Sequence, residues 1–109
     1  MTEVMIYAFE PVAASTVQIN VSASNQRVQL GNNSGISHKR NRTIRVFNEG
    51  SATVWIEFGI DNTIAAAVAT GMPVPAGAVE VFTGISANYV AAIAAGATGK
   101  VYFTAGDGT

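Results

Sequence analysis

The sequence contains no cysteine, which excludes disulfide bonds, thiolate metal sites and a cysteine nucleophile together. Its one histidine, His38, has no second histidine or cysteine with which to hold a metal ion, and alone it completes no catalytic triad. No segment approaches the roughly 18 consecutive apolar residues that a membrane-spanning helix needs. The first residues lack the basic start of a secretion signal, so we expect a protein made and assembled in the cytosol, with no membrane partner.

Charged residues are scarce as well. They make up 12% of the 109 residues, about half the share of roughly 25% in an average globular domain, while apolar residues make up 49%. The formal net charge of -1 gives no overall attraction to nucleic acid, which is therefore not an expected partner. So few charges solvate a free monomer poorly, and we predict that neighbouring protein subunits cover much of the surface.

The sequence does contain the period-two alternation that is typical of β-strands with one buried face. Residues 16–22 alternate without error and place Val17, Ile19 and Val21 on one side. Seven more segments have strand character and end in Gly, Asn, Pro or Ser turns: residues 4–9, 26–30, 43–48, 52–58, 79–83, 88–94 and 100–104. We therefore predict one all-β domain over residues 1–109, an antiparallel β-sandwich or jelly roll of about eight short strands.

The connections between these segments predict three local features. Residues 43–58 form the clearest hairpin, in which Gly50 could supply the positive φ of a short loop. Residues 61–69 combine a capping Asp61 with an alanine run, which allows one short helical turn. Residues 31–42 are the longest expected loop, and such loops often carry function.

The alternation also places four aromatic rings on the outward side of the strands. When the flanking aliphatic residues face the core, the outward rings are those of Phe47, Trp55, Phe82 and Tyr102. One interpretation is that these rings anchor a subunit interface, with Trp55 as the preferred anchor, because Trp and Tyr are enriched there and charge is depleted. The alternative is that bends, bulges or an overlying loop bury some of them within the chain.

A basic cluster follows His38. Its members are Lys39, Arg40, Arg42 and Arg45. It could bind a phosphate backbone or an acidic protein patch, or it could be a solvated rim with no partner. Because the rest of the chain provides no wider basic face, we expect an acidic surface on a neighbouring subunit, if any partner uses this loop.

The sequence shows no convincing set of catalytic or metal-binding residues. Glu57, Asp61 and Asp107 do not have the spacing of a known ligand loop, and residues 96–100 lack the ending of a phosphate-binding loop. No acid, base and nucleophile converge, so we expect no enzymatic activity and no cofactor.

Strand ends and turns after Arg45 carry a family resemblance. The segments are residues 45–50 (RVFNEG), 54–59 (VWIEFG), 72–82 with MPVPAGA leading into VF, and 90–104. Together they resemble small all-β virion proteins of tailed bacteriophages, over about three-fifths of the chain. The resemblance carries over no catalytic residue.

The resemblance implies a capsid decoration or cement protein, which would bind the major capsid protein or other virion subunits, commonly as a trimer or dimer. Its expected location is the virion, after assembly in the cytoplasm of the host bacterium. Two alternatives remain open: an accessory protein of the head–tail junction or tail, and a carbohydrate-binding module whose exposed rings stack on sugars.

Overall fold

The computed structural model describes residues 10–11, 15–30, 42–85, 87–96 and 98–107, and these residues fold entirely into strands, turns and loops. The predicted strand at residues 4–9 and most of the predicted loop at residues 31–42 lie outside this part of the chain. The strands are β1 (Glu10–Pro11), β2 (Val17–Val21), β3 (Gln26–Gln29), β4 (Arg42–Asn48), β5 (Val54–Gly59), β6 (Met72–Val74), β7 (Val79–Ile85), β8 (Tyr89–Ala94) and β9 (Gly99–Asp107).

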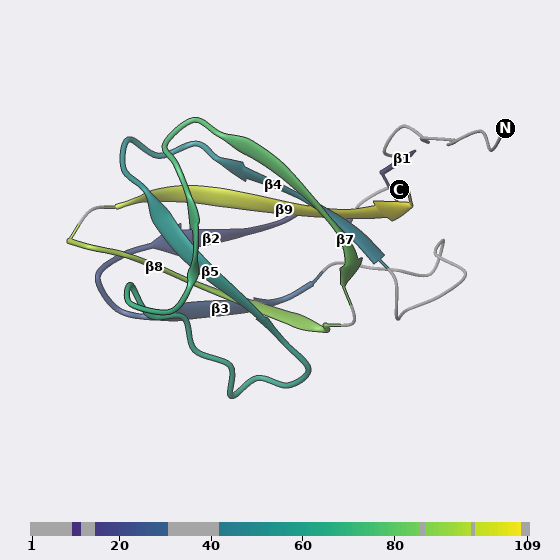
Figure 1. Ribbon diagram of the computed structural model, residues 1–109, viewed down its shortest axis with the longest axis horizontal. Helices are drawn as coiled ribbons and strands as arrows, with labels where there is room; N and C mark the ends of the chain where they lie inside the picture. Colours follow the sequence, from purple (N-terminus) through teal and green to yellow (C-terminus); the bar gives the residue numbers. More distant parts are fainter. Residues whose placement is uncertain (1–9, 12–14, 31–41, 86, 97, 108–109) are drawn as a thin grey trace, which may run out of the picture.

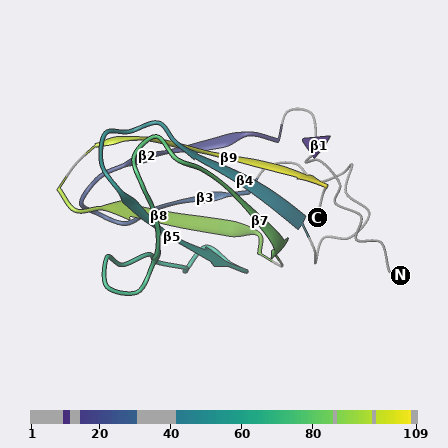
Figure 2. The ribbon, with the colours of Figure 1, turned by 45° about the horizontal axis from the view of Figure 1, so that its top comes forward.

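The strands form two antiparallel sheets packed as a sandwich. The first sheet has the order β2-β9-β4-β7, with the two-residue β1 pairing with β9 beside β2, and the second has the order β3-β8-β5-β6. Figures 1 and 2 show β2, β9 and β4 in one layer and β3, β8 and β5 in the other. The pairs β2·β9, β3·β8, β4·β7 and β5·β6 are those of one long hairpin rolled into two layers, which is the jelly-roll arrangement. The predicted all-β fold class is confirmed.

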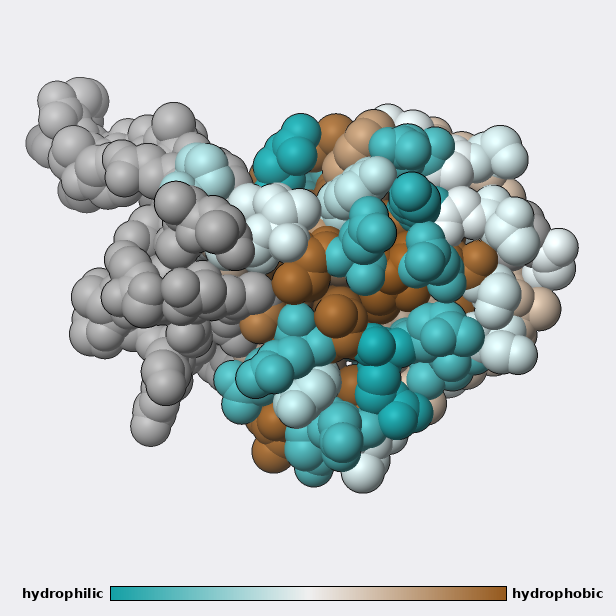
Figure 3. All heavy atoms as spheres, turned by 180° about the vertical axis from the view of Figure 1, so that it is seen from behind, coloured by the Kyte–Doolittle hydropathy of each residue, from teal (hydrophilic) through white to brown (hydrophobic). Residues whose placement is uncertain are grey.

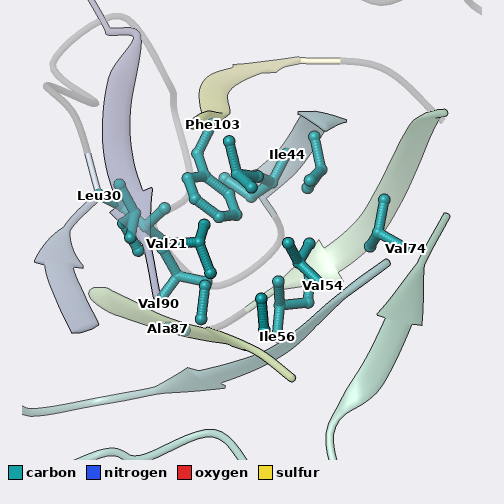
Figure 4. Packing of buried hydrophobic residues seen from close by; sticks show 14 of the residues in the cluster. Val21, Leu30, Ile44, Val54, Ile56, Val74, Ala87, Val90 and Phe103 are labelled. Atoms are coloured by element: carbon teal, nitrogen blue, oxygen red, sulfur yellow. The ribbon is translucent and has the colours of Figure 1, made fainter. Parts of the chain in front are cut away.

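The core lies between the two sheets and consists mainly of the inward-facing apolar residues that the alternation predicts. Phe103, Ile44 and Val46 project into it from the first sheet, and Ile56 and Val90 from the second, and all are at most 1% exposed. Figure 4 shows Phe103, Ile44, Ile56 and Val90 among the side chains that pack together there. Full burial of one such side chain contributes about 1.5–3 kcal/mol, so this cluster is the main source of stability.

On the side turned away from the viewer in Figure 1, hydrophobic residues also reach the surface as a band between hydrophilic ones (Figure 3).

Asn48, at the end of β4, ties together the hairpin and the connection from β6 to β7. The side chain is fully buried, and its Nδ2 donates to the carbonyl oxygens of Ala52 at 2.9 Å, Val74 at 3.0 Å and Pro75 at 3.2 Å. Its Oδ1 accepts a 3.0 Å hydrogen bond from the backbone N–H of Gly50. One amide therefore satisfies buried backbone groups from two separate turns.

The glycines at the turns differ from the prediction. The described glycines with positive φ are Gly77, at 73°, and Gly96, at 84°, so the expectation of a positive φ at Gly50 was wrong. Gly50 and Gly99 are needed for space instead: a Cβ on Gly50 would lie 3.3 Å from the Cα of Gly99, and a Cβ on Gly99 would lie 2.9 Å from the Cα of Gly50. The hairpin and the start of β9 thus touch backbone to backbone, which only glycine allows.

The connection from β5 to β6 packs against the second sheet without forming a helix. Asp61 accepts hydrogen bonds from the backbone and hydroxyl of Thr63, but no helix follows it, and residues 62–63 and 68–70 are turns. The segment is held to the sheet because Arg27 Nε donates to the Ile64 carbonyl at 2.9 Å. A Cβ on Gly59 would lie 2.6 Å from the Ile64 Cβ, which shows how closely this connection is packed.

Candidate functional site

The outer face of the first sheet carries partly exposed apolar side chains in a continuous row. Tyr102 of β9 lies directly opposite Phe47 of β4, and Phe47 lies opposite Val79 of β7. Val81 follows two residues along β7, opposite Arg45. Directly opposed residues of an antiparallel pair share a face and contact each other. We call the set Phe47, Tyr102, Val79 and Val81 the apolar row.

The two rings of the apolar row stack on one another. Their centroids lie 6.1 Å apart with an interplanar angle of 16°, and both side chains are half-buried. Glu49 is held beside them, since its backbone N–H donates to the Lys100 carbonyl at 2.9 Å. Desolvation raises the pKa of Tyr102, and a hydrogen bond to the Glu49 carboxylate and the negative charge of that group raise it further. The phenol therefore stays neutral and donates to Glu49 at ordinary pH.

The face assignment of β7 was wrong. The alternation predicts Val79 and Val81 inside and Phe82 outside, but Val79 is 46% and Val81 49% exposed. Phe82 lies opposite the buried Ile44, packs on the core and meets the Phe58 ring edge-on at 5.7 Å. It is therefore a partly buried core residue on the inner side of the sheet.

The reason for this error is the position of β7 at the edge of the sheet. Glu80 shares the inner side of β7 with Phe82, since it lies opposite the buried Val46, yet it is exposed. At an edge the inner side is incompletely covered, so a charged residue there can reach water. The alternation of Val79, Glu80 and Val81 therefore assigns the buried side incorrectly.

Only part of the predicted basic cluster falls within the described residues. Arg45 lies exposed on the outer face of β4, beside the apolar row. Arg42 begins β4, where the structure describes its backbone alone. Lys39 and Arg40, like His38, lie outside the described residues, so the structure does not address their predicted role.

Trp55 lies on the outer face of the second sheet, opposite Ile93 of β8 and Pro73 of β6. Its outward direction was predicted, because its neighbours in β5 are buried. The connection from β5 to β6 passes close to it: a Cβ on Gly71 would lie 2.9 Å from the Trp55 Cβ. Trp55 is accordingly half-buried, as in the predicted alternative in which an overlying loop covers part of an outward ring.

The described residues show no cluster of side chains suited to binding a metal ion. They contain no group of three or more His, Asp or Glu side chains placed to hold a metal ion. Asp61 is engaged by Thr63, whose hydrogen bonds lower the pKa of the Asp61 carboxyl. Glu57 lies on the outer face of β5, and Asp107 ends β9, where its side chain is not described.

A shallow, open groove lies where the turn after β2 meets the start of β9. Its lining includes the side chains of Asn20, Gln26 and Lys100. The lining contains no acidic residue and no aromatic ring that could stack on a sugar. The groove therefore does not provide the ring stacking that the carbohydrate-binding alternative requires. In the part of the chain that the structure describes, no helix is long and apolar enough to span a membrane.

Comparison with known proteins finds similarity only in fold. No family model matches the sequence, and no curated protein matches it. A solved structure described as "Bacillus endospore appendages form a novel family of disulfide-linked pili" matches with a TM-score of 0.55 and 14% sequence identity. The match covers 97% of this chain and 90% of the other. The match shows a shared β-sandwich fold, and fold alone does not assign function.

Proposed function

We propose that this chain is a non-catalytic structural subunit that packs against other protein subunits through the outer face of its first sheet. The observation that carries the proposal is the apolar row, in which Val79 and Val81 are about half exposed beside two stacked rings. Scattered exposed hydrophobic residues are common, but a contiguous group on a flat sheet is typical of an interaction site. The low charge content of 12% fits a surface that is covered in use.

The particle that we propose is the virion of a tailed bacteriophage, in which the chain decorates and stabilises the capsid shell. The sequence resemblance after Arg45 supports this, and the jelly roll is a fold that viral capsid domains use. The proposed partners are the major capsid protein and other virion subunits, and the proposed place of assembly is the host cytoplasm. A position at the head–tail junction or on the tail would use the same kind of contact.

A pilus-like filament is the second candidate. It is favoured by the fold match to the endospore appendage protein, which spans nearly the whole of both chains. That protein is described as forming disulfide-linked pili, whereas this chain has no cysteine. A filament of this chain would therefore be held together without disulfide bonds.

The test is to purify phage particles and surface filaments from the bacterium that encodes the chain, and to analyse each fraction by mass spectrometry. We expect the chain in the phage fraction, in fixed proportion to the major capsid protein. Recovery in the filament fraction would favour the second candidate. Recovery only as free protein, in neither fraction, would refute a structural role.

Single substitutions then examine the contact surface. Replacing Val81 with Lys places a charge in the apolar row, and we expect it to lower the occupancy of the chain on purified particles. Trp55, the preferred anchor predicted from the sequence, lies on the opposite sheet, and Trp55→Ala examines it separately. If Trp55→Ala lowers occupancy and Val81→Lys does not, the contact lies on the second sheet.

A tryptophan-fluorescence titration with sugars examines the carbohydrate-binding alternative, which requires saturable binding.

A further inference from the structure

The apolar row runs to the open edge of the first sheet, so it could serve either an edge-to-edge or a face-to-face contact. The edge strands on this side of the sandwich are unsuited to pairing with another strand. Glu80 faces the inner side of β7, and Pro73 lies within β6, where it has no N–H to donate. Inward charges and prolines are the features that block pairing at sheet edges. The exposed valines are therefore available to a partner through the face of the sheet.

The charges around the apolar row make this face complementary to itself. Arg45 and Lys100 lie exposed on the same outer face, and Glu49 lies beside Tyr102. A face that carries an apolar row with both signs of charge beside it can meet a copy of itself across a two-fold axis with unlike charges opposed. We infer that the partner on this face is a second copy of this chain, packed outer face against outer face. This inference rests on the proposed function, because it names the subunit that the apolar row contacts.

The size of the face is sufficient for such a dimer. Four strands about 4.8 Å apart, each about seven residues long at roughly 3.3 Å per residue, present a projected area of about 440 Å². Projecting side chains make the accessible area larger than its projection. Stable interfaces bury roughly 600–1,000 Å² per partner, so the face fits the lower end of that range. The dimer should therefore dissociate on dilution.

The experiment measures self-association of the purified full chain by sedimentation over a wide concentration range. Val81→Lys perturbs the row, and Val68→Lys is the matched control, since Val68 is 42% exposed in the connection from β5 to β6, away from the first sheet. We expect wild type to dimerise, Val81→Lys to raise the dissociation constant at least about tenfold, and Val68→Lys to leave it unchanged. Circular dichroism confirms that each variant keeps its β-sheet spectrum.

Two results would overturn the inference. One is a wild-type chain that stays monomeric at every concentration, and the other is an equal loss of dimer in both lysine variants. A different result would refute the proposed function: the chain would be absent from purified particles. A monomeric chain that still occupies particles, and loses occupancy in Val81→Lys, would show that the row binds a different subunit.

Discussion

The buried amide of Asn48 permits a quantitative prediction of stability. Its Nδ2 carries two N–H groups, shared among three carbonyl oxygens, and its Oδ1 accepts one further bond, so about three full hydrogen bonds depend on it. At about 1 kcal/mol net for each bond, Asn48→Ala should lower the free energy of unfolding by about 3 kcal/mol. For a domain of this size, that loss lowers the melting temperature by roughly 12–24 °C.

The assay is urea or thermal unfolding followed by circular dichroism at one fixed protein concentration. Asn20→Ala is the control, because Asn20 is exposed on β2 and should tolerate the change to within about 0.5 kcal/mol. If Asn48→Ala unfolds as wild type does, the bonds of Asn48 contribute nothing net and the reasoning fails.

Asn48→Asp sharpens the same prediction because it keeps the shape and changes only the hydrogen-bonding groups. Its carboxylate would face the carbonyl oxygens of Ala52, Val74 and Pro75 with no proton to donate. Burial and these oxygens raise the pKa of the introduced carboxyl above its unfolded value of about 3.9. A raised folded pKa stabilises the fold below the unfolded pKa, and this contribution is lost as pH rises through the folded pKa. The stability deficit relative to wild type should therefore be larger at neutral pH than near pH 4, and a deficit independent of pH would contradict this account.

Three further predictions concern single sites. Gly99→Ala should destabilise the fold by about 1–3 kcal/mol in urea unfolding, because its Cβ would lie 2.9 Å from the Gly50 backbone, and an unchanged midpoint would mean that the two segments separate freely. Phe82→Ala should cost about 2–4 kcal/mol by the same measurement because Phe82 packs on the core, whereas an outward-facing ring would cost little. Glu49→Gln should lower the pKa of Tyr102, because it removes the negative charge that helps to raise this pKa. An ultraviolet titration measures the pKa when the signal of the Tyr102→Phe variant is subtracted. An unchanged pKa would mean that desolvation alone raises it.

The layered fold could be predicted from the sequence because alternation over several strands is redundant. In β2, β4, β5 and β9, successive inward positions carry buried or partly buried apolar residues, so an error at one residue does not shift the pattern. The short strand β6 was missed because it has three residues and contains Pro73, which is tolerated only because β6 lies at an edge. The pairing of strands distant in sequence depends on the whole chain, so the choice between sandwich and jelly roll required the structure.

The interaction surface was predicted less completely, because faces at a sheet edge follow different rules from faces at its centre. The outward directions of Phe47 and Tyr102 follow from buried neighbours on central strands and are confirmed. The exposure of Val79 and Val81 could not be inferred from the sequence. Without the strand order, Glu80 between them suggests that its own side of β7 faces solvent, whereas that side is the inner one. Strand order determines which polar residues can face inward, and it is a property of the fold and not of the local sequence.

The absence of cysteine determines how any assembly of this chain behaves. A contact between subunits that is not covalent is reversible, and its occupancy follows subunit concentration. When each contact has a moderate area, a subunit binds more tightly through two contacts than through one, since it leaves only when both open together. The outer face of the first sheet and Trp55 on the second lie on opposite sides of the sandwich, so both could be engaged at once. A subunit with two such faces can join neighbours into a shell or a filament without covalent links.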